Sequence, residues 1–172
     1  TYALYDAYVD QSCQAYYEAS GLSPAACMLS NNSFPFIQSD SFVIQSQTDS
    51  VVLTGHDCWP EDYMNESPEQ EFMSQWHQNM TTALIPLMKI PLHDDQDKHN
   101  EHDKAAENRS VVVRNGVFAA ACYTHGGFTH AYPLIQNMNF YDAFGNFYFE
   151  RTTPAKYKLA DDCGEMCNPT CG

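Results

Sequence analysis

One histidine and one aspartate follow two apolar segments of the sequence. His125 comes shortly after the uncharged run Val117–Cys122, which has the length and composition of a strand buried on both faces of a sheet. Asp49 comes shortly after the β-rich run Phe42–Ser46. Open α/β sheets bind ligands beyond the carboxyl ends of their strands, so both side chains have the position expected of catalytic groups. A structural histidine in a loop is the plainer alternative, because the chain holds seven histidines.

A histidine base oriented by an acid is the chemistry of Ser-His-Asp hydrolases, and α/β-hydrolases carry these residues in the chain order Ser, Asp, His. Asp49 and His125 have this order, and two glycines directly after His125 would let a substrate or a second chain approach the imidazole closely. The nucleophile belongs in Gly-x-Ser-x-Gly between a strand and a helix. The nearest match, Gly21-Leu22-Ser23-Pro24-Ala25, does not fit the tight elbow and follows no predicted strand. The sequence therefore predicts an acid and a base without their nucleophile.

Three segments have the spacing of helices that would flank these strands. Residues 1–20, rich in Tyr and Ala, predict one or two short helices that stop at Gly21. Ser67 as cap and Pro68 at the first helical position begin a second helix, which we expect to end before Pro86. A third helix covers residues 140–148. Outside these helices, Asn115-Gly116 is a turn signal before the second apolar run. The apolar stripes of the last two helices are Phe72, Met73, Trp76, Met80, Ala83 and Leu84, and Phe140, Ala143, Phe144, Phe147 and Tyr148.

Composition limits the possible partners. The chain has 172 residues, enough for one domain with a sizeable core, and 44% of them are hydrophobic. Its net charge of -14 repels phosphate backbones and anionic membrane surfaces, so we expect no nucleic-acid partner. No apolar stretch approaches the roughly 18 residues of a transmembrane segment. The chain starts at Thr1 without Met or a signal peptide, which suggests a processed, soluble product.

Cysteines and glycosylation sequons favour an oxidising, extracellular setting. A zinc site would need a second close pair beside the carboxyl-terminal cluster, so disulfides are the better interpretation. Cys13 and Cys27 could link the first helical segment to the turn after it, and an odd number leaves one thiol free or bonded to another chain. The disulfide candidates are Cys13, Cys27, Cys58, Cys122, Cys163, Cys167 and Cys171. The sequons begin at Asn31, Asn65, Asn79 and Asn108.

Residues 89–110 form a polar segment that we expect to be a surface insertion. Within it, His93–Asp103 contains the residue types of a metal site. Their spacing is irregular, and solvated acidic segments have the same composition. We therefore predict no metal ligands, and a metal site is the alternative.

The sequence contains several ordered blocks that carry a family resemblance: residues 42–50, 116–125, 140–151, and 162–163 with 167–171. Between residues 10 and 171 they resemble, in order, the pectin acetylesterase and Notum carboxylesterase group of α/β-hydrolases. The first two are similar to the strand that leads to that family's catalytic Asp and to its strand, cysteine and catalytic His. The others resemble a late helix, where the family often has Trp at the place of Phe147, and the carboxyl terminus. Cys27, which precedes the first of these blocks, also has a counterpart in the family.

The resemblance implies a secreted carboxylic ester hydrolase in which His125 is the base and Asp49 the acid, with Asp40 as a nearby competitor for the acid. It implies no cofactor, and a substrate that is an O-acyl ester on a polysaccharide or an acylated protein. The chain would be one partial α/β-hydrolase domain, residues 1–172, comprising the carboxyl-terminal part of the sheet with flanking helices and disulfides. Its partner would be an upstream chain of the same precursor that carries the nucleophile. The alternative is a catalytically silent extracellular glycoprotein with a structural, assembly or adhesion role.

Overall fold

A computed structural model describes residues 8–59, 67–89, 114–129, 131–150 and 152–171. The chain divides into two compact units, Thr1–Ser39 and Asp40–Gly172. No described helix has both the length and the apolar character needed to cross a membrane.

The first unit is a set of short helices joined by a disulfide. Its elements are α2 (Gln11–Ala19), η1 (Pro24–Met28), α3 (Ser30–Ser33) and η2 (Phe34–Phe36). α2 begins at Asp10, whose carboxylate accepts hydrogen bonds from the backbone N–H groups of Ser12 and Cys13. Cys13 is disulfide-bonded to Cys27, and both are buried with Val9 in a small apolar cluster. The expected link between the first helix and the following turn is thus present.

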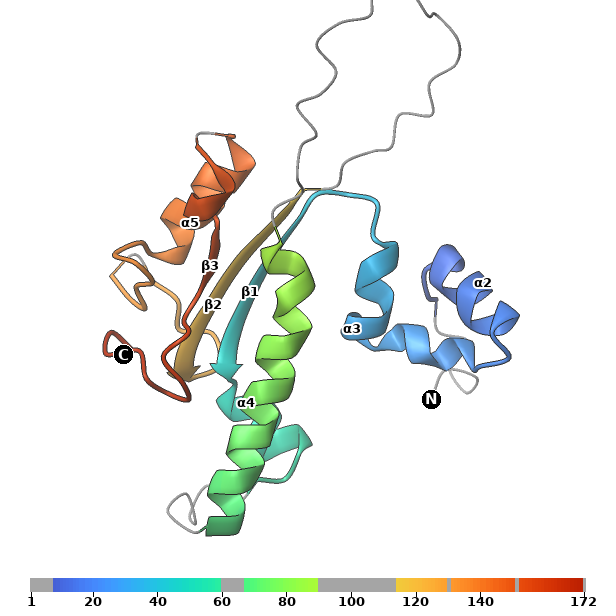
Figure 1. The fold of residues 1–172 in the computed structure, drawn as a ribbon, viewed down its shortest axis with the longest axis horizontal. Helices are drawn as coiled ribbons and strands as arrows, with labels where there is room; N and C mark the ends of the chain where they lie inside the picture. The colour runs from blue at the N-terminus through green and yellow to red at the C-terminus, as the bar shows by residue number, and fades with distance from the viewer. Residues whose placement is uncertain (1–7, 60–66, 90–113, 130, 151, 172) are drawn as a thin grey trace, which may run out of the picture. The chain divides into compact units, whose positions relative to one another are not determined.

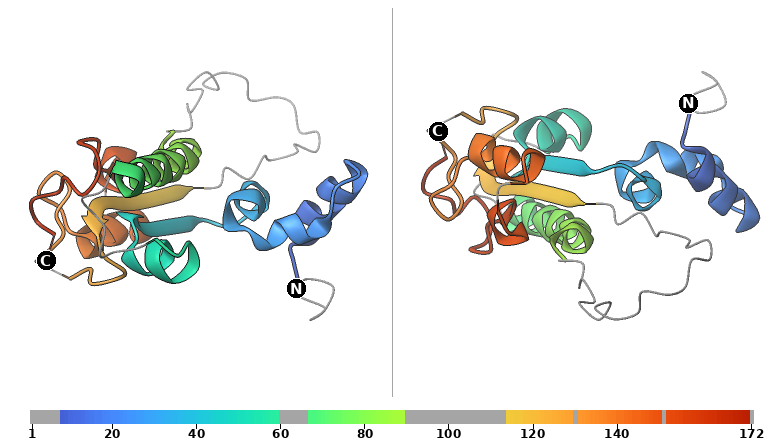
Figure 2. Two further views of the ribbon diagram at one scale, coloured as in Figure 1. Left: turned by 90° about the horizontal axis from the view of Figure 1, so that it is seen from below. Right: turned by 90° about the horizontal axis from the view of Figure 1, so that it is seen from above.

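The second unit is a parallel sheet with helices on both faces, so the expected α/β class is confirmed. Its strands, in the order β1 (Ser41–Thr48), β2 (Asn115–Tyr123) and β3 (Lys158–Ala160), all run in the same direction. α4 (Ser67–Met88) and α5 (Phe140–Tyr148) lie on opposite sides of the sheet (Figures 1 and 2). A π-helix, η3 (Val52–His56), follows β1, and η5 (Pro154–Lys156) precedes β3. All carboxyl ends of the strands therefore meet at one edge of the sheet.

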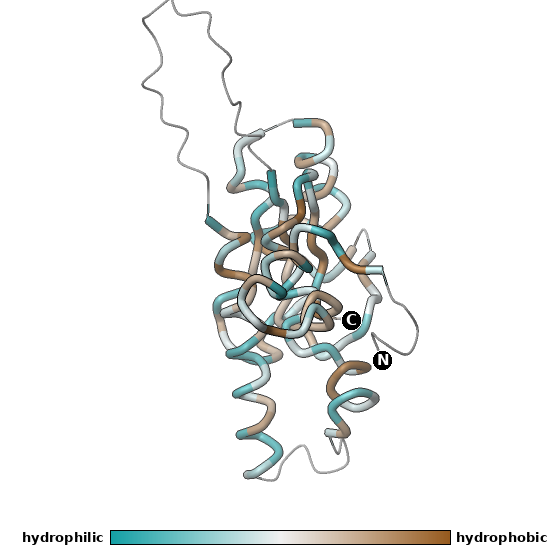
Figure 3. The backbone as a smooth tube through the Cα atoms, turned by 90° about the vertical axis from the view of Figure 1, so that its right-hand side faces the viewer, coloured by the Kyte–Doolittle hydropathy of each residue, from teal (hydrophilic) through white to brown (hydrophobic). Residues whose placement is uncertain are grey.

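The central strand β2 is buried along nearly its whole length, as its uncharged sequence predicts. Residues 117–122 are each 0% exposed. Phe118, Ala120 and Cys122 pack with Ala143 of α5 and Leu159 of β3 in one apolar cluster. In Figure 3 the helices are mixed in hydropathy, with hydrophobic and hydrophilic residues close together along their turns.

β2 begins earlier than its sequence suggests, so the interpretation of Asn115-Gly116 as a turn was wrong. Both residues pair with β1. Gly116 serves a close approach instead, because a Cβ atom there would lie 2.2 Å from the Phe42 ring. That ring packs edge-on against Phe144 of α5. The missing side chain thus lets an aromatic ring cross the start of the strand.

α4 also differs from expectation, since it continues through Pro86 to Met88. Pro86 lies in the last turn, where a proline removes only one backbone donor near the helix end. The buried residues of α4 are Met73, Leu84 and Leu87, whereas Phe72 and Ala83 of the expected stripe are exposed. On α5, Ala143 and Phe147 are buried, and Phe144 and Tyr148 are largely exposed.

A buried cation holds the end of α4 against the sheet. Lys158 of β3 is 9% exposed, and its Nζ donates a hydrogen bond to the carbonyl oxygen of Leu87 at 2.7 Å and another to that of Lys89. Burial lowers the pKa of Lys158 below its ordinary value. The expected polar insertion follows directly, but its residues 90–110 lie outside the described part of the chain.

An exposed ion pair fixes the start of the β1–β2 pairing and makes a pH-dependent contribution to stability. The backbone N–H of Arg114, and then its guanidinium, lower the pKa of Asp40 below its ordinary value of about 3.8. Because the pKa of Asp40 is lower in the folded than in the unfolded state, the ion pair stabilises the fold at pH values above the unfolded-state pKa. This contribution is lost as the pH falls through the folded-state pKa.

We therefore expect urea denaturation at pH 6 to give a lower free energy of unfolding for Asp40→Asn than for the parent protein. The difference should be below about 1 kcal/mol because the pair is exposed. The difference should shrink below pH 4. A difference that grows on acidification would contradict this assignment.

Candidate active site

His125 and Asp49 meet at the carboxyl ends of neighbouring strands. Asp49 directly follows β1, and His125 follows β2 after one intervening residue. The His125 Nδ1 atom is 2.9 Å from each carboxylate oxygen of Asp49. An ionised carboxylate only accepts hydrogen bonds, so Nδ1 carries a hydrogen and donates it. Nδ1 is thereby engaged, and Nε2 remains as the nitrogen that can exchange a proton with another group.

Backbone hydrogen bonds hold the Asp49 carboxylate in place independently of its contact with His125. Its Oδ1 accepts hydrogen bonds from the backbone N–H groups of Val51 and Val52, both at 3.0 Å, at the beginning of the helical turn after β1. The Asp49 side chain is 9% exposed. These contacts leave the carboxylate little freedom to rotate, so the imidazole has one preferred orientation.

The His125 side chain, by contrast, is 56% exposed. Among the described residues, no group forms a hydrogen bond with its Nε2. Gly126 and Gly127 have φ angles of +73° and +71°, and nothing lies within 4 Å of a Cβ built on Gly126. The loop is therefore open beside the imidazole, as the two glycines predict.

The other candidates from the sequence lie elsewhere or have structural roles. Asp40 precedes β1 and pairs with Arg114, so it stands at the opposite end of the strand from His125. The Ser23 side chain caps η1 by accepting the Ala25 N–H. The described residues contain no group of three or more His, Cys, Asp or Glu side chains that could hold a metal ion. The metal-like stretch His93–Asp103 lies outside them.

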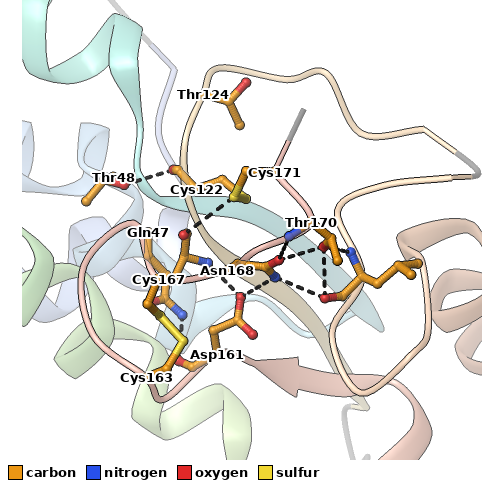
Figure 4. Close-up of a disulfide and its surroundings, with 12 residues drawn as sticks. Gln47, Thr48, Cys122, Thr124, Asp161, Cys163, Cys167, Asn168, Thr170 and Cys171 are labelled. Atoms are coloured by element: carbon orange, nitrogen blue, oxygen red, sulfur yellow. Dashed lines mark hydrogen bonds between the residues drawn. A yellow bond between two sulfur atoms is a disulfide. The ribbon is translucent and has the colours of Figure 1, made fainter.

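Below the site, the carboxyl-terminal segment is bound to β2 by a polar network that sequence reasoning did not find (Figure 4). Buried Asn168 donates from its backbone to the Ala121 carbonyl and from its side chain to Asp161 and to the Leu134 carbonyl. Asp161 in turn accepts the Ala121 N–H at 2.8 Å. A disulfide between Cys122 and Cys171 closes the same region. The sequence shows a cluster of cysteines in this segment, but it does not show which residues of β2 the segment binds.

Three disulfides account for six of the seven cysteines. They join Cys13 to Cys27, Cys122 to Cys171, and Cys163 to Cys167. Cys58 is free and exposed. Two expected glycosylation sites, Asn31 and Asn79, are exposed, whereas Asn65 and Asn108 lie outside the described residues. Their glycosylation stays a prediction.

Peptide mapping of the unreduced protein should find these three disulfides and one alkylatable thiol, at Cys58. Replacing Cys122 and Cys171 together by serine should lower the free energy of unfolding by about 4 kcal/mol, because their sequence separation of 49 residues makes a long loop. The double serine variant of Cys163 and Cys167, separated by 4 residues, is the matched control and should lose less. Equal losses for both pairs would argue against this explanation.

Comparison with known protein families identifies the chain. The family model described as pectinacetylesterase matches residues 5–172, which include the second unit, all but the first four residues of the first unit, the Asp49–His125 pair and every cysteine. The chain belongs to the pectinacetylesterase family. A search of curated proteins found no match.

Membership in the pectinacetylesterase family makes the chain a carboxylesterase-type hydrolase by descent. The disulfides of this pectinacetylesterase-family chain fit an oxidising environment. The geometry found at the strand ends is also the geometry that ester hydrolysis by a histidine base requires.

Proposed function

We propose that this chain supplies the base and the acid of a Ser-His-Asp triad in a secreted carboxylic ester hydrolase. The observation that carries the proposal is the hydrogen-bonded pair of His125 Nδ1 and the buried Asp49 carboxylate, in which the His125 side chain is 56% exposed. Family membership supports the same reaction class.

In this mechanism His125 Nε2 takes the proton from a serine hydroxyl as the serine oxygen attacks the ester carbonyl carbon. The resulting tetrahedral intermediate collapses as His125 returns the proton to the leaving alcohol, which leaves an acyl-enzyme. Water then attacks the acyl-enzyme with the same proton transfers. Asp49 keeps Nδ1 protonated throughout and stabilises the imidazolium without itself taking the proton.

The nucleophile is assigned to a segment other than residues 1–172, either an upstream chain of the same precursor or a separate partner. The sequence supplies no Gly-x-Ser-x-Gly. Among the strands of the described residues, β1 lies at one edge of the sheet. An unpaired edge of a parallel sheet can accept another strand. A segment that adds a parallel strand there would end near Asp49, and a serine at its end could then reach His125.

The proposed substrate is an O-acyl ester on a polysaccharide or an acylated protein. The family description favours an acetyl ester of pectin among these. The test is hydrolysis of acetylated pectin and of a small acetyl ester by the purified protein, together with any polypeptide that copurifies with it. Release of acetate by a preparation containing a second chain with Gly-x-Ser-x-Gly is the expected result.

Absence of hydrolysis with such a partner confirmed would instead favour a structural or adhesive glycoprotein. The exposed sequon at Asn79 and the free thiol of Cys58 would then serve assembly.

A further inference from the structure

The pairing of β1 and β2 becomes irregular close to His125 and Asp49. The register is regular as far as Ser46 opposite Ala120, but the next recorded pair is Thr48 with Tyr123. β1 advances two residues, from 46 to 48, while β2 advances three, from 120 to 123. β2 therefore carries one extra residue, a β-bulge, directly before the loop that bears the histidine.

The bulge decides how far His125 lies beyond Asp49. A regular register would put Thr48 opposite Cys122, and His125 would then lie two positions beyond the residue opposite Asp49. With the bulge it lies one position beyond, which is about 3.3 Å nearer along the strand. The 2.9 Å contacts between Nδ1 and the carboxylate therefore depend on this extra residue.

A side-chain hydrogen bond joins the two strands inside the bulge. The Thr48 hydroxyl donates to the carbonyl oxygen of Cys122 at 2.8 Å, and both residues are 0% exposed. The sulfur of Cys122 is bonded to Cys171. Figure 4 shows Cys122 held in both ways, at its backbone by Thr48 and at its side chain by the disulfide. Thr48 directly precedes Asp49, and Cys122 is three residues before His125, so this bond links the two strand ends that carry the pair.

We propose that Thr48 is a positioning residue, whose hydroxyl keeps the bulge in the register that lets His125 meet Asp49. It acts through the backbone of Cys122 and does not touch the substrate. The hydrolysis readout rests on the proposed function, whereas the hydrogen bond itself can be measured in the resting protein. A displacement of about 1 Å at a catalytic group can lower turnover by up to about 100-fold, so a loosened bulge should be visible in kcat.

The experiment records the downfield Nδ1–H proton resonance of His125 by NMR, assigned by its loss in His125→Gln, in the complete protein. Thr48→Val keeps the shape and removes the hydroxyl, and it should weaken this resonance by faster exchange with water. Thr48→Ser restores the hydroxyl and should restore the resonance. Thr54→Val is the matched control, because Thr54 also donates to a backbone carbonyl, that of Ser50, but within one helical turn.

In the assembled hydrolase, Thr48→Val should lower kcat about tenfold with little change in KM, and Thr48→Ser should recover most of it. If the valine variant does not fold, Thr48→Ala replaces it, since it removes the hydroxyl without adding a methyl group against the carbonyl. A normal resonance in folded Thr48→Val or Thr48→Ala, or an equal loss in Thr54→Val or Thr48→Ser, overturns the inference. If the resonances change as expected but no form of the protein hydrolyses the ester, the inference about Thr48 is upheld and the proposed function is overturned.

Discussion

His125→Ala is expected to lower ester hydrolysis by the assembled protein about 10⁵-fold, because among the described residues His125 is the histidine that a carboxylate orients at the strand ends. Nδ1 is engaged by Asp49, so the proton transfer falls to Nε2 of a side chain that is 56% exposed. The effect should fall on kcat, since proton transfer occurs in the transition state and contributes little to substrate binding.

The same substitution should change the free energy of unfolding by about 1 kcal/mol or less. The His125 side chain is 56% exposed, and Asp49 keeps its hydrogen bonds from Val51 and Val52. His56→Ala, which removes another exposed histidine, is the control and should retain full activity. Initial rates with a small acetyl ester, measured beside thermal melts, distinguish a lost base from a lost fold. Hydrolysis by His125→Ala at the parental rate would refute the mechanism.

Asp49→Asn should lower turnover about 10⁴-fold, somewhat less than the loss of the histidine. Asparagine has nearly the same shape, but its amide cannot stabilise an imidazolium, and its NH₂ group can hold the wrong ring tautomer. The residue is buried and shares its Oδ1 with two backbone N–H groups, so the carboxamide should still occupy the same place.

Asp40→Asn is the matched control, since it makes the same chemical change at the other end of β1. Asp40 pairs with Arg114 and has no contact with His125, so this variant should hydrolyse esters at nearly the parental rate. The comparison is made as kcat at saturating substrate for both variants. Equal losses in the two variants would show that the carboxylates act through the fold and would contradict the assignment of Asp49 as the orienting acid.

The sequence predicts the parts of this site that depend on continuous apolar runs. Residues 117–122 carry no charge, and a strand buried on both faces has that pattern, so the position of His125 at a strand end follows from it. The acid was harder to choose, because Asp40 and Asp49 flank the same run. The structure separates them: one precedes β1 and the other follows it. Sequence order alone does not show which aspartate lies at the carboxyl end of the strand until the strand boundaries are known.

Other features were not predictable because tertiary contacts override the local pattern. β3 is short and contains Lys158, a residue that is rarely buried and that here reaches the carbonyl groups at the end of α4. Pro86 is tolerated within α4, although a proline usually ends a helix. The bulge between Ser46 and Thr48 depends on the pairing of segments more than 70 residues apart. No local signal marks it, yet it sets the distance on which the site depends.

Imidazole rescue of His125→Ala tests the role of His125 most directly. The side chain is exposed and its loop is open, so imidazole from solution can enter the space left by the ring and accept the serine proton. We expect added imidazole to restore part of the hydrolysis of a small acetyl ester, saturably and above the rate of imidazole alone, in His125→Ala but not in Asp49→Asn. Parental hydrolysis by His125→Ala without imidazole, or equal stimulation of both variants, would contradict the assignment of His125 as the base.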